Sequence, residues 1–221
     1  MVVPVLKTAL LLSVLVLACT SEVSQRLREL DSPHTQVRAD AVKRLGELGD
    51  RRVVPRLIPL LKQDTSVIVR FEVALALGRL GESEAIPALA EAAKNDPSPD
   101  VMLAATKALG DLGPKAVEPL IELLSSRLAP VRLLSARELG RLRATSAVRP
   151  LIERLNDPDP GVRKAAVYAL RRIGTAEAME AVARMLSRPD QELESAAGEA
   201  LGGAGYEADL EELRQLLRRF R

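Results

Sequence analysis

The chain has 221 residues, of which 47% are hydrophobic and only 2% are aromatic. It carries 32 basic and 30 acidic side chains, a balance that gives no reason to expect binding to nucleic acid or to an anionic membrane surface. The single cysteine cannot form a disulfide within the chain, so a stable core has to come from aliphatic packing.

Residues 1–18 are expected to be a signal peptide. They carry one charge, Lys7, ahead of the apolar run 9–17, which is too short to span a bilayer. The run ends in the sequence Val-Leu-Ala at 16–18, directly before Cys19. An ordinary secretory leader followed by a chance cysteine is one interpretation of this pattern.

The same residues resemble the bacterial lipobox, in which the cysteine is joined to a diacylglycerol and the leader is cut just before it. The resemblance implies lipidation at Cys19, a short tether over 19–23 and a folded domain over 24–221. The protein would then be held at the bacterial cell envelope through its N-terminal lipid only. Thr20, in place of an aspartate after the cysteine, implies the outer membrane, with the domain facing the periplasm or the cell surface.

One phrase returns six times along the rest of the chain. It has a valine that is usually followed by arginine, then usually alanine four positions on, leucine at eight, and glycines at nine and twelve. The copies begin at Val37, Val69, Val101, Val131, Val162 and Leu193. Successive copies start 30 to 32 residues apart. Repetition at this period predicts a solenoid, because one such unit cannot bury its apolar face without neighbours.

The second copy predicts two antiparallel helices per unit. Apolar residues at helical spacing predict a helix over residues 66–80, and Gly81 follows as a left-handed stop. Ser83 can cap a second helix that ends near Asn95. Glycines recur inside the first helix of five units, at Gly46, Gly78, Gly110, Gly140 and Gly202. Each costs about 1 kcal/mol against alanine, so they predict close approach of neighbouring helices.

These phrases resemble HEAT repeats, and more closely the short HEAT-like repeats of the phycobilisome-lyase type. The matching residues are Asp64 and Arg70, Asp157 and Arg163, and the prolines Pro55, Pro87, Pro119 and Pro150. The resemblance implies an all-α, right-handed α-solenoid of about six helix pairs, with the Val-Arg helices on the concave side. Residues 22–30 would be the outer helix of the first pair, and 209–220 a closing C-terminal helix.

Four arginines follow the first valine of their units and form a ladder. They are Arg38, Arg70, Arg132 and Arg163. Such a ladder can clamp anions, or it can pair with aspartates in the turns, which is what the HEAT resemblance implies. Met102 and Glu194 interrupt the ladder, which favours the structural role.

No catalytic residue, metal ligand or cofactor is expected from the sequence. The one histidine, His34, excludes the several histidine-glutamate pairs of HEAT-like di-iron hydroxylases, and no phosphate loop or paired cysteines occur. The bilin-lyase relatives have no simple motif. An enzyme or enzyme subunit of that group is therefore the alternative function.

Positions two and six of each phrase should point away from the core. In the middle units these positions combine apolar and basic side chains, which predicts a partner-binding surface: Phe71, Leu75, Leu103, Lys107, Leu133, Arg137, Lys164 and Tyr168. Partial burial by the curvature of the solenoid is the alternative explanation. The expected function is a non-catalytic scaffold that binds a protein or extended peptide of acidic or amphipathic character.

Overall fold

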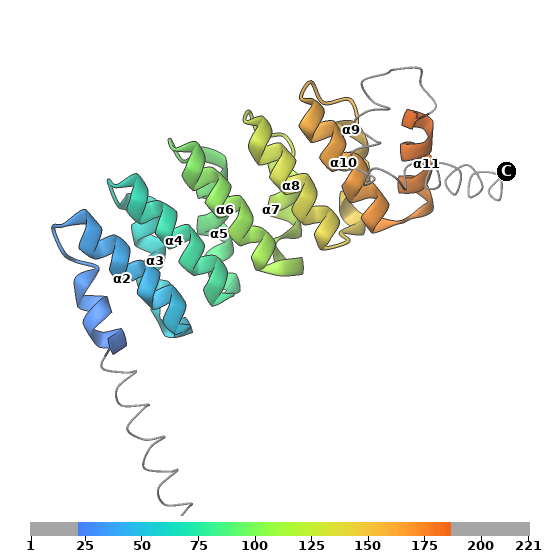
Figure 1. Ribbon diagram of the computed structural model, residues 1–221. Coiled ribbons are helices and arrows are strands. Elements are labelled where there is room, and N and C mark those ends of the chain that lie inside the picture. The colour runs from blue at the N-terminus through green and yellow to red at the C-terminus, as the bar shows by residue number, and fades with distance from the viewer. Residues whose placement is uncertain (1–21, 187–221) are drawn as a thin grey trace, which may run out of the picture.

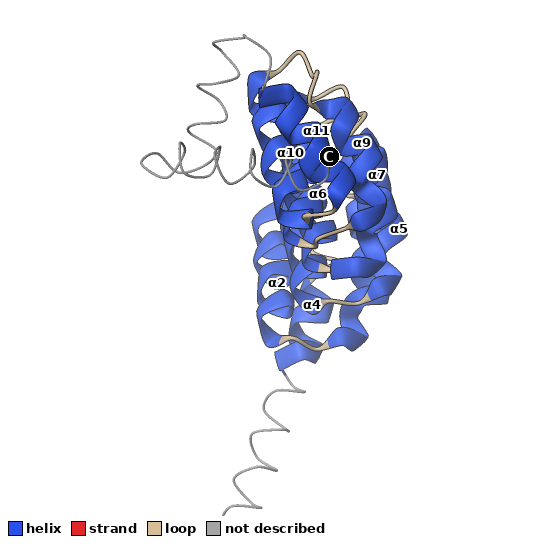
Figure 2. Cartoon of the chain, turned by 90° about the vertical axis from the view of Figure 1, so that its right-hand side faces the viewer, coloured by secondary structure: helices blue, strands red, loops and turns tan. Residues whose placement is uncertain are grey.

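The computed structural model describes residues 22–186, and all regular structure in this part of the chain is helical (Figure 1). The helices alternate between two layers that are seen side on in Figure 2, with α2, α6 and α10 in one layer and α5, α7 and α9 in the other. This stack of helix pairs is an α-solenoid, as the sequence period predicted.

We call the layer of the Val-Arg helices the inner layer and the other the outer layer. The inner layer consists of α2 (Thr35–Leu48), α4 (Val67–Leu80), α6 (Pro99–Asp111), α8 (Ala129–Arg141) and α10 (Pro160–Ile173). The outer layer begins with a helix over residues 22–29 and continues with α3 (Val54–Gln63), α5 (Ile86–Asn95), α7 (Val117–Leu123), α9 (Val148–Arg154) and α11 (Ala176–Leu186). Short 3₁₀ turns lead into four of the outer helices: η1 (Arg51–Val53), η2 (Ser83–Ala85), η3 (Gly113–Ala116) and η4 (Thr145–Ala147). Ser83 therefore begins a 3₁₀ turn, and α5 starts two residues later than a cap at Ser83 would place it.

Left-handed residues end the inner helices. Gly49, Gly81 and Gly174 follow α2, α4 and α10 with φ between 70° and 73°, a conformation that glycine adopts without steric cost. After α8 the same role falls to Arg143, with φ 51°, the one non-glycine residue of positive φ among residues 22–186. The stop predicted at Gly81 is confirmed, and the unit with Arg143 in place of the glycine still takes the left-handed turn.

The glycines inside the inner helices allow neighbouring helices to approach closely. A Cβ built at Gly46 would lie 2.9 Å from the Cβ of Ala76, and one at Gly78 would lie 2.9 Å from the Cβ of Ala108. At Gly140 it would lie 2.6 Å from the Cα of Ala169. The close approach predicted from these glycines is confirmed at all three contacts.

Several predictions concern residues outside the described part of the chain. They are the signal peptide at 1–18, lipidation of Cys19, the unit that begins at Leu193 and the closing helix at 209–220. The last residues of the expected tether, 22 and 23, are already helical, and Val23 is buried in the core. None of the helices between residues 22 and 186 is long and apolar enough to cross a membrane.

Candidate binding surface

An arginine near the start of α2 ties two turns of the solenoid together. Arg38 donates from Nε and Nη2 to the carboxylate of Asp64, at 2.8 and 2.9 Å. Its Nη1 donates to the backbone carbonyl of Ser32 at 2.9 Å. One side chain therefore joins the turn before its own helix to the turn before the next inner helix. We call this arrangement a clamp.

Arg70 and Arg132 form the same clamp in more buried surroundings. Arg70 donates to Asp96 at 2.8 and 3.0 Å, and Arg132 donates to Asp157 at 2.8 and 2.6 Å. None of these four side chains is more than 11% exposed. Two parallel hydrogen bonds to an aspartate occupy the planar guanidinium of each arginine. The structural role therefore accounts for Arg70 and Arg132, and neither guanidinium is open for binding an external anion.

Arg163 makes the near half of the same arrangement. Its Nη1 donates to the carbonyls of Asp157 and Pro158, at 3.0 and 3.2 Å. The residues that would supply the far half lie outside the described part of the chain.

The clamps shift the pKa values of their carboxyl groups downward. Burial raises the pKa of Asp64 and of Asp157, but hydrogen bonds from Arg38 and Arg132 and from backbone N–H groups outweigh it. The result in both cases is a pKa below the usual value. The hydrogen bond to the aspartate raises the pKa of each arginine, so the pairs are ionised at neutral pH.

The apolar part of the predicted surface is half-buried. We call Phe71, Leu75, Leu103 and Leu133 the stripe; they lie on α4, α6 and α8. All four pack against the core and keep part of their surface exposed. The expectation that they point away from the core is wrong to this extent, because neighbouring helices cover their flanks. For example, a Cβ built at Gly161 on α10 would lie 3.0 Å from Cδ1 of Leu133.

Ile68 extends the stripe and was not among the predicted contacts. It is 55% exposed, the largest fraction for a large apolar side chain in the described part of the chain. Ile68 precedes Phe71 by three positions on α4, so the two lie on the same side of the helix. That spacing is the signal that could have identified it.

The basic part of the predicted surface is divided between α8 and α10. Arg137 is exposed, and no hydrogen bond or ion pair holds it within residues 22–186. Tyr168 is 38% exposed and accepts a hydrogen bond from Nη1 of Arg172 at 3.0 Å. The Arg172 guanidinium lies 5.7 Å from the ring centroid, within range of a cation–π contact. Lys164 is half-buried on the same helix.

Lys107 is committed to a charged cluster and does not project freely. Its Nζ lies 2.5 Å from Asp111 and 3.4 Å from Glu138. Burial lowers the pKa of Lys107, but the hydrogen bond to Asp111 and the charges of both carboxylates outweigh this and raise it. Glu138 is buried, and it also accepts a hydrogen bond from Nε of Arg141 at 2.6 Å.

A comparison of the sequence with models of known protein families identifies the family of the chain. Models of HEAT repeats match residues 22–110, 87–156, 117–202 and 148–219. The chain belongs to the HEAT repeat family. No curated protein matches its sequence.

Several solved structures share the fold. A chain of the complex of CpcE and CpcF of phycocyanin lyase from Nostoc sp. PCC7120 is 25% identical, over 86% of this chain and 79% of that one, with a TM-score of 0.59. The Escherichia coli protein YibA is 21% identical over 83% of this chain and 72% of its own, with a TM-score of 0.55. An engineered protein is 21% identical over 87% and 96%, with a TM-score of 0.51.

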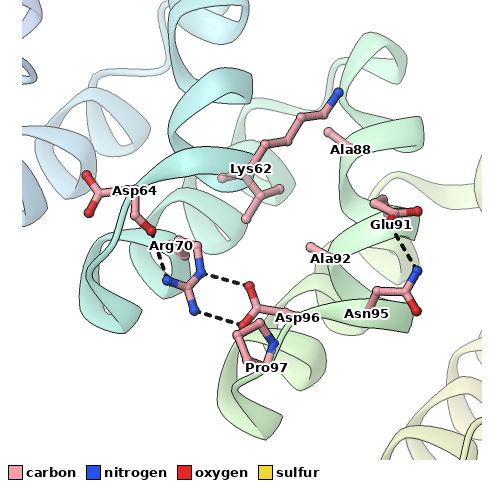
Figure 3. A pocket seen from close by; sticks show the side chains of 10 residues that line it. Lys62, Asp64, Arg70, Ala88, Glu91, Ala92, Asn95, Asp96 and Pro97 are labelled. Atoms are coloured by element: carbon pink, nitrogen blue, oxygen red, sulfur yellow. Dashed lines mark hydrogen bonds and ion pairs between the residues drawn. The ribbon is translucent and has the colours of Figure 1, made fainter.

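A pocket of about 500 Å³ opens between α3, α5 and the start of α4 (Figure 3). It exists because α5 carries small side chains at Ala88 and Ala92, which line it. The charged groups at its base are already paired, since Arg70 binds Asp96. At its rim, Glu91 accepts a hydrogen bond from Asn95 at 3.0 Å. The pocket therefore presents less unused chemistry than the inner helices do.

Within residues 22–186, no three histidine, cysteine, aspartate or glutamate side chains gather as a metal site. The candidate site is the surface of the inner helices, with its apolar part on α4, α6 and α8 and its arginine-tyrosine part on α8 and α10. We call this the inner face.

Proposed function

We propose that this HEAT repeat protein is a non-catalytic scaffold whose inner face binds a protein or an extended peptide. The observation that carries the proposal is the combination of Ile68 and the half-exposed stripe with the exposed Arg137 on α8. Apolar side chains bordered by charge are common at partner sites, where the apolar groups give affinity and the charges select the partner.

The proposed partner is acidic or amphipathic. Its apolar side chains would contact Ile68, Phe71 and Leu103, and its carboxylates would meet Arg137 and the Arg172–Tyr168 pair. Arginine and tyrosine suit this role because both combine a flat apolar surface with hydrogen-bond donors.

Site-specific photocrosslinking in intact cells tests the location of the site. A photoreactive amino acid at Ile68 or Tyr168 should give the same crosslinked partner, identified by mass spectrometry. Matched controls are Glu118 and Arg149, which are exposed at the outer layer. Partner crosslinks that arise at the outer positions and not at the inner ones would refute an inner-face site.

The proposed location is the bacterial cell envelope, with a lipid on Cys19 as the only attachment to the membrane. The support is the sequence Val-Leu-Ala-Cys at 16–19. Changing Cys19→Ala should release the protein from the membrane fraction or leave an uncleaved precursor. Unchanged detergent partitioning and lipid labelling in the variant would remove this part of the proposal.

An enzyme or enzyme subunit related to the bilin lyases is the second candidate. It is favoured by the similarity to the CpcE–CpcF complex, which has a TM-score of 0.59. The two candidates differ in what the purified protein should carry. Visible absorption from a bound bilin, or specific capture of a bilin-carrying protein, would support the lyase-related function over the scaffold.

A further inference from the structure

One junction of the solenoid lacks both of the ties that repeat elsewhere in the inner layer. The first tie is the clamp between an arginine and the aspartate of the following turn. The second is the contact between a glycine of one inner helix and an alanine of the next. Both are present between α2 and α4, between α4 and α6, and between α8 and α10. The exception is the junction of α6 with α8.

The clamp is missing there because both of its partners are replaced. Met102 stands on α6 where the other units have arginine, and it is buried. Ser126 stands five residues before Val131, at the place that Asp64, Asp96 and Asp157 occupy in the other turns. Its Oγ accepts a hydrogen bond from the backbone N–H of Leu128, inside its own turn. No charge-assisted bond therefore joins this turn to the preceding one through an inner-helix arginine.

The glycine contact is altered at the same junction. A Cβ built at Gly110 would meet three side-chain atoms of Glu138, at 2.5 to 2.7 Å. At the other three junctions the nearest atoms are the Cβ and Cα of an alanine. A carboxylate side chain thus lies between α6 and α8 where backbone meets backbone elsewhere. It is held by Lys107 and Arg141, and Arg141 also donates to the carbonyl of Gly110 at 2.6 Å.

A second polar group is buried on α8 one turn before Glu138. The hydroxyl of Ser135 is fully buried and makes no hydrogen bond. The equivalent residues of neighbouring units are Val73, Ala105 and Ala166. Burial of the core side of α8 therefore contributes less to stability than burial of the equivalent side of the other inner helices, since an unpaired hydroxyl is costly to bury.

We infer that the α6–α8 junction is a joint at which the solenoid changes its curvature. It separates a first block, residues 22–111, from a second block, residues 126–186, whose first turn is held to α8 because Arg132 donates to the carbonyls of Ser126 and Arg127. Close apolar contacts and buried bidentate pairs have one favoured geometry, whereas ion pairs of half-exposed side chains exchange partners at little cost. Lys107 and Arg141 are 45% and 48% exposed, so the cluster that bridges the joint is of the second kind.

The joint also has a consequence for partner binding, which rests on the proposed function. Phe71 and Leu75 lie on the first block, and Arg137 and Tyr168 lie on the second. Movement at the joint changes the separation between the apolar side chains of the first block and the arginine-tyrosine part of the inner face on the second. A partner that contacts both parts selects one curvature of the solenoid.

Dipolar electron spin resonance on the full chain tests the joint without any partner. Spin labels carried on a genetically encoded amino acid leave Cys19 unchanged. One pair, at Gln36 and Asp100, spans α2 to α6 within the first block. The other, at Thr65 and Arg127, spans the same number of repeats across the joint. All four positions are exposed.

We expect the distance distribution across the joint to be broader than that within the block by a factor of about two. The triple variant Met102→Arg, Ser126→Asp, Glu138→Ala restores both ties and should narrow it to the width of the control pair. If that variant does not fold, Glu138→Ala alone should produce part of the narrowing. The proposal of a joint is refuted if the two pairs give distance distributions of equal width in the native chain. It is also refuted if the distribution across the joint is as broad in the restored variant as in the native chain. Because no partner is present, failure of the proposed function leaves this result unaffected.

Discussion

The junctions α4–α6 and α6–α8 do the same structural task with different chemistry. Between α4 and α6, Gly78 lies against Ala108, and Arg70 binds Asp96 in a buried pair. Between α6 and α8, Glu138 fills the helix contact, and Met102 replaces the arginine. The first junction has shape complementarity and a directional tie, whereas the second has a bridging cluster of charges that solvent can reach.

The difference shows how a solenoid tolerates such an exchange. Each unit contacts mainly its neighbours, so the stability of the array is approximately a sum over units and junctions. One junction can then lose its clamp while the apolar layer stays continuous, as the fully buried Leu109 and Leu139 on either side demonstrate. A weaker junction changes the mechanics of the array more than its fold.

Replacing a clamp of the first block with the residues found at the joint should produce the largest change in the free energy of unfolding. Arg70→Met leaves the carboxylate of Asp96 buried without its partner, which should cost about 3 to 5 kcal/mol in urea unfolding. The double variant Arg70→Met, Asp96→Ser removes the buried charge as well and should cost less than the single change. As a control, Arg149→Met breaks an exposed pair with Glu177 and should cost at most about 1 kcal/mol. A double variant no more stable than Arg70→Met would show that the clamp is not a self-contained unit.

The bridging cluster of the joint can be measured by a double-mutant cycle. Lys107→Ala and Glu138→Ala should be non-additive, with a coupling free energy of about 0.5 to 3 kcal/mol, because each removes the charged partner of the other. Lys43→Ala, at the equivalent exposed position of α2, should change stability by about 0.5 kcal/mol or less. Strict additivity between Lys107 and Glu138 would mean that their ion pair does not bridge the two helices.

The fold followed from the sequence because its signals are local. The period of the phrase, the phase of the inner helices and the left-handed stop at Gly81 depend on residues within one unit. The glycine contacts were predictable for a similar reason, since a repeated mid-helix glycine has few explanations other than close approach.

The surface was less predictable because it depends on how units stack. Arg70 binds the carboxylate of Asp96, 26 residues later, whereas its bond to the turn before α4 goes to the backbone carbonyl of Asp64. Lys107 was expected to face solvent freely, but Glu138 of the next unit draws it into a cluster. The half-burial of Phe71 has the same origin, because it is set by the distance to neighbouring helices.

Acidification should weaken the clamps formed by Asp64 and Asp157. The folded-state pKa values of Asp64 and Asp157 lie below the ordinary value of 3.8. Their contribution to stability is therefore complete above that value and is lost as the pH falls through the lower folded-state values. Thermal melts followed by circular dichroism should show a melting temperature that drops in this acid range. Asp64→Asn should flatten the drop, and Asp40→Asn, at an exposed position of α2, should leave it unchanged.

The smallest expected effect is a gain in stability at the end of α8. Arg143 holds the left-handed conformation, with φ 51°, that glycine holds after α2, α4 and α10. This conformation is strained for a residue with a Cβ, so Arg143→Gly should stabilise the protein by about 0.5 to 1 kcal/mol. The gain should appear in urea unfolding at neutral pH. Arg127→Gly provides the control, because Arg127 is an exposed turn residue without positive φ, where glycine adds only freedom to the unfolded chain. If both substitutions destabilise the protein equally, the backbone at Arg143 is not strained. The unit that contains α8 then differs from the other units only at the joint.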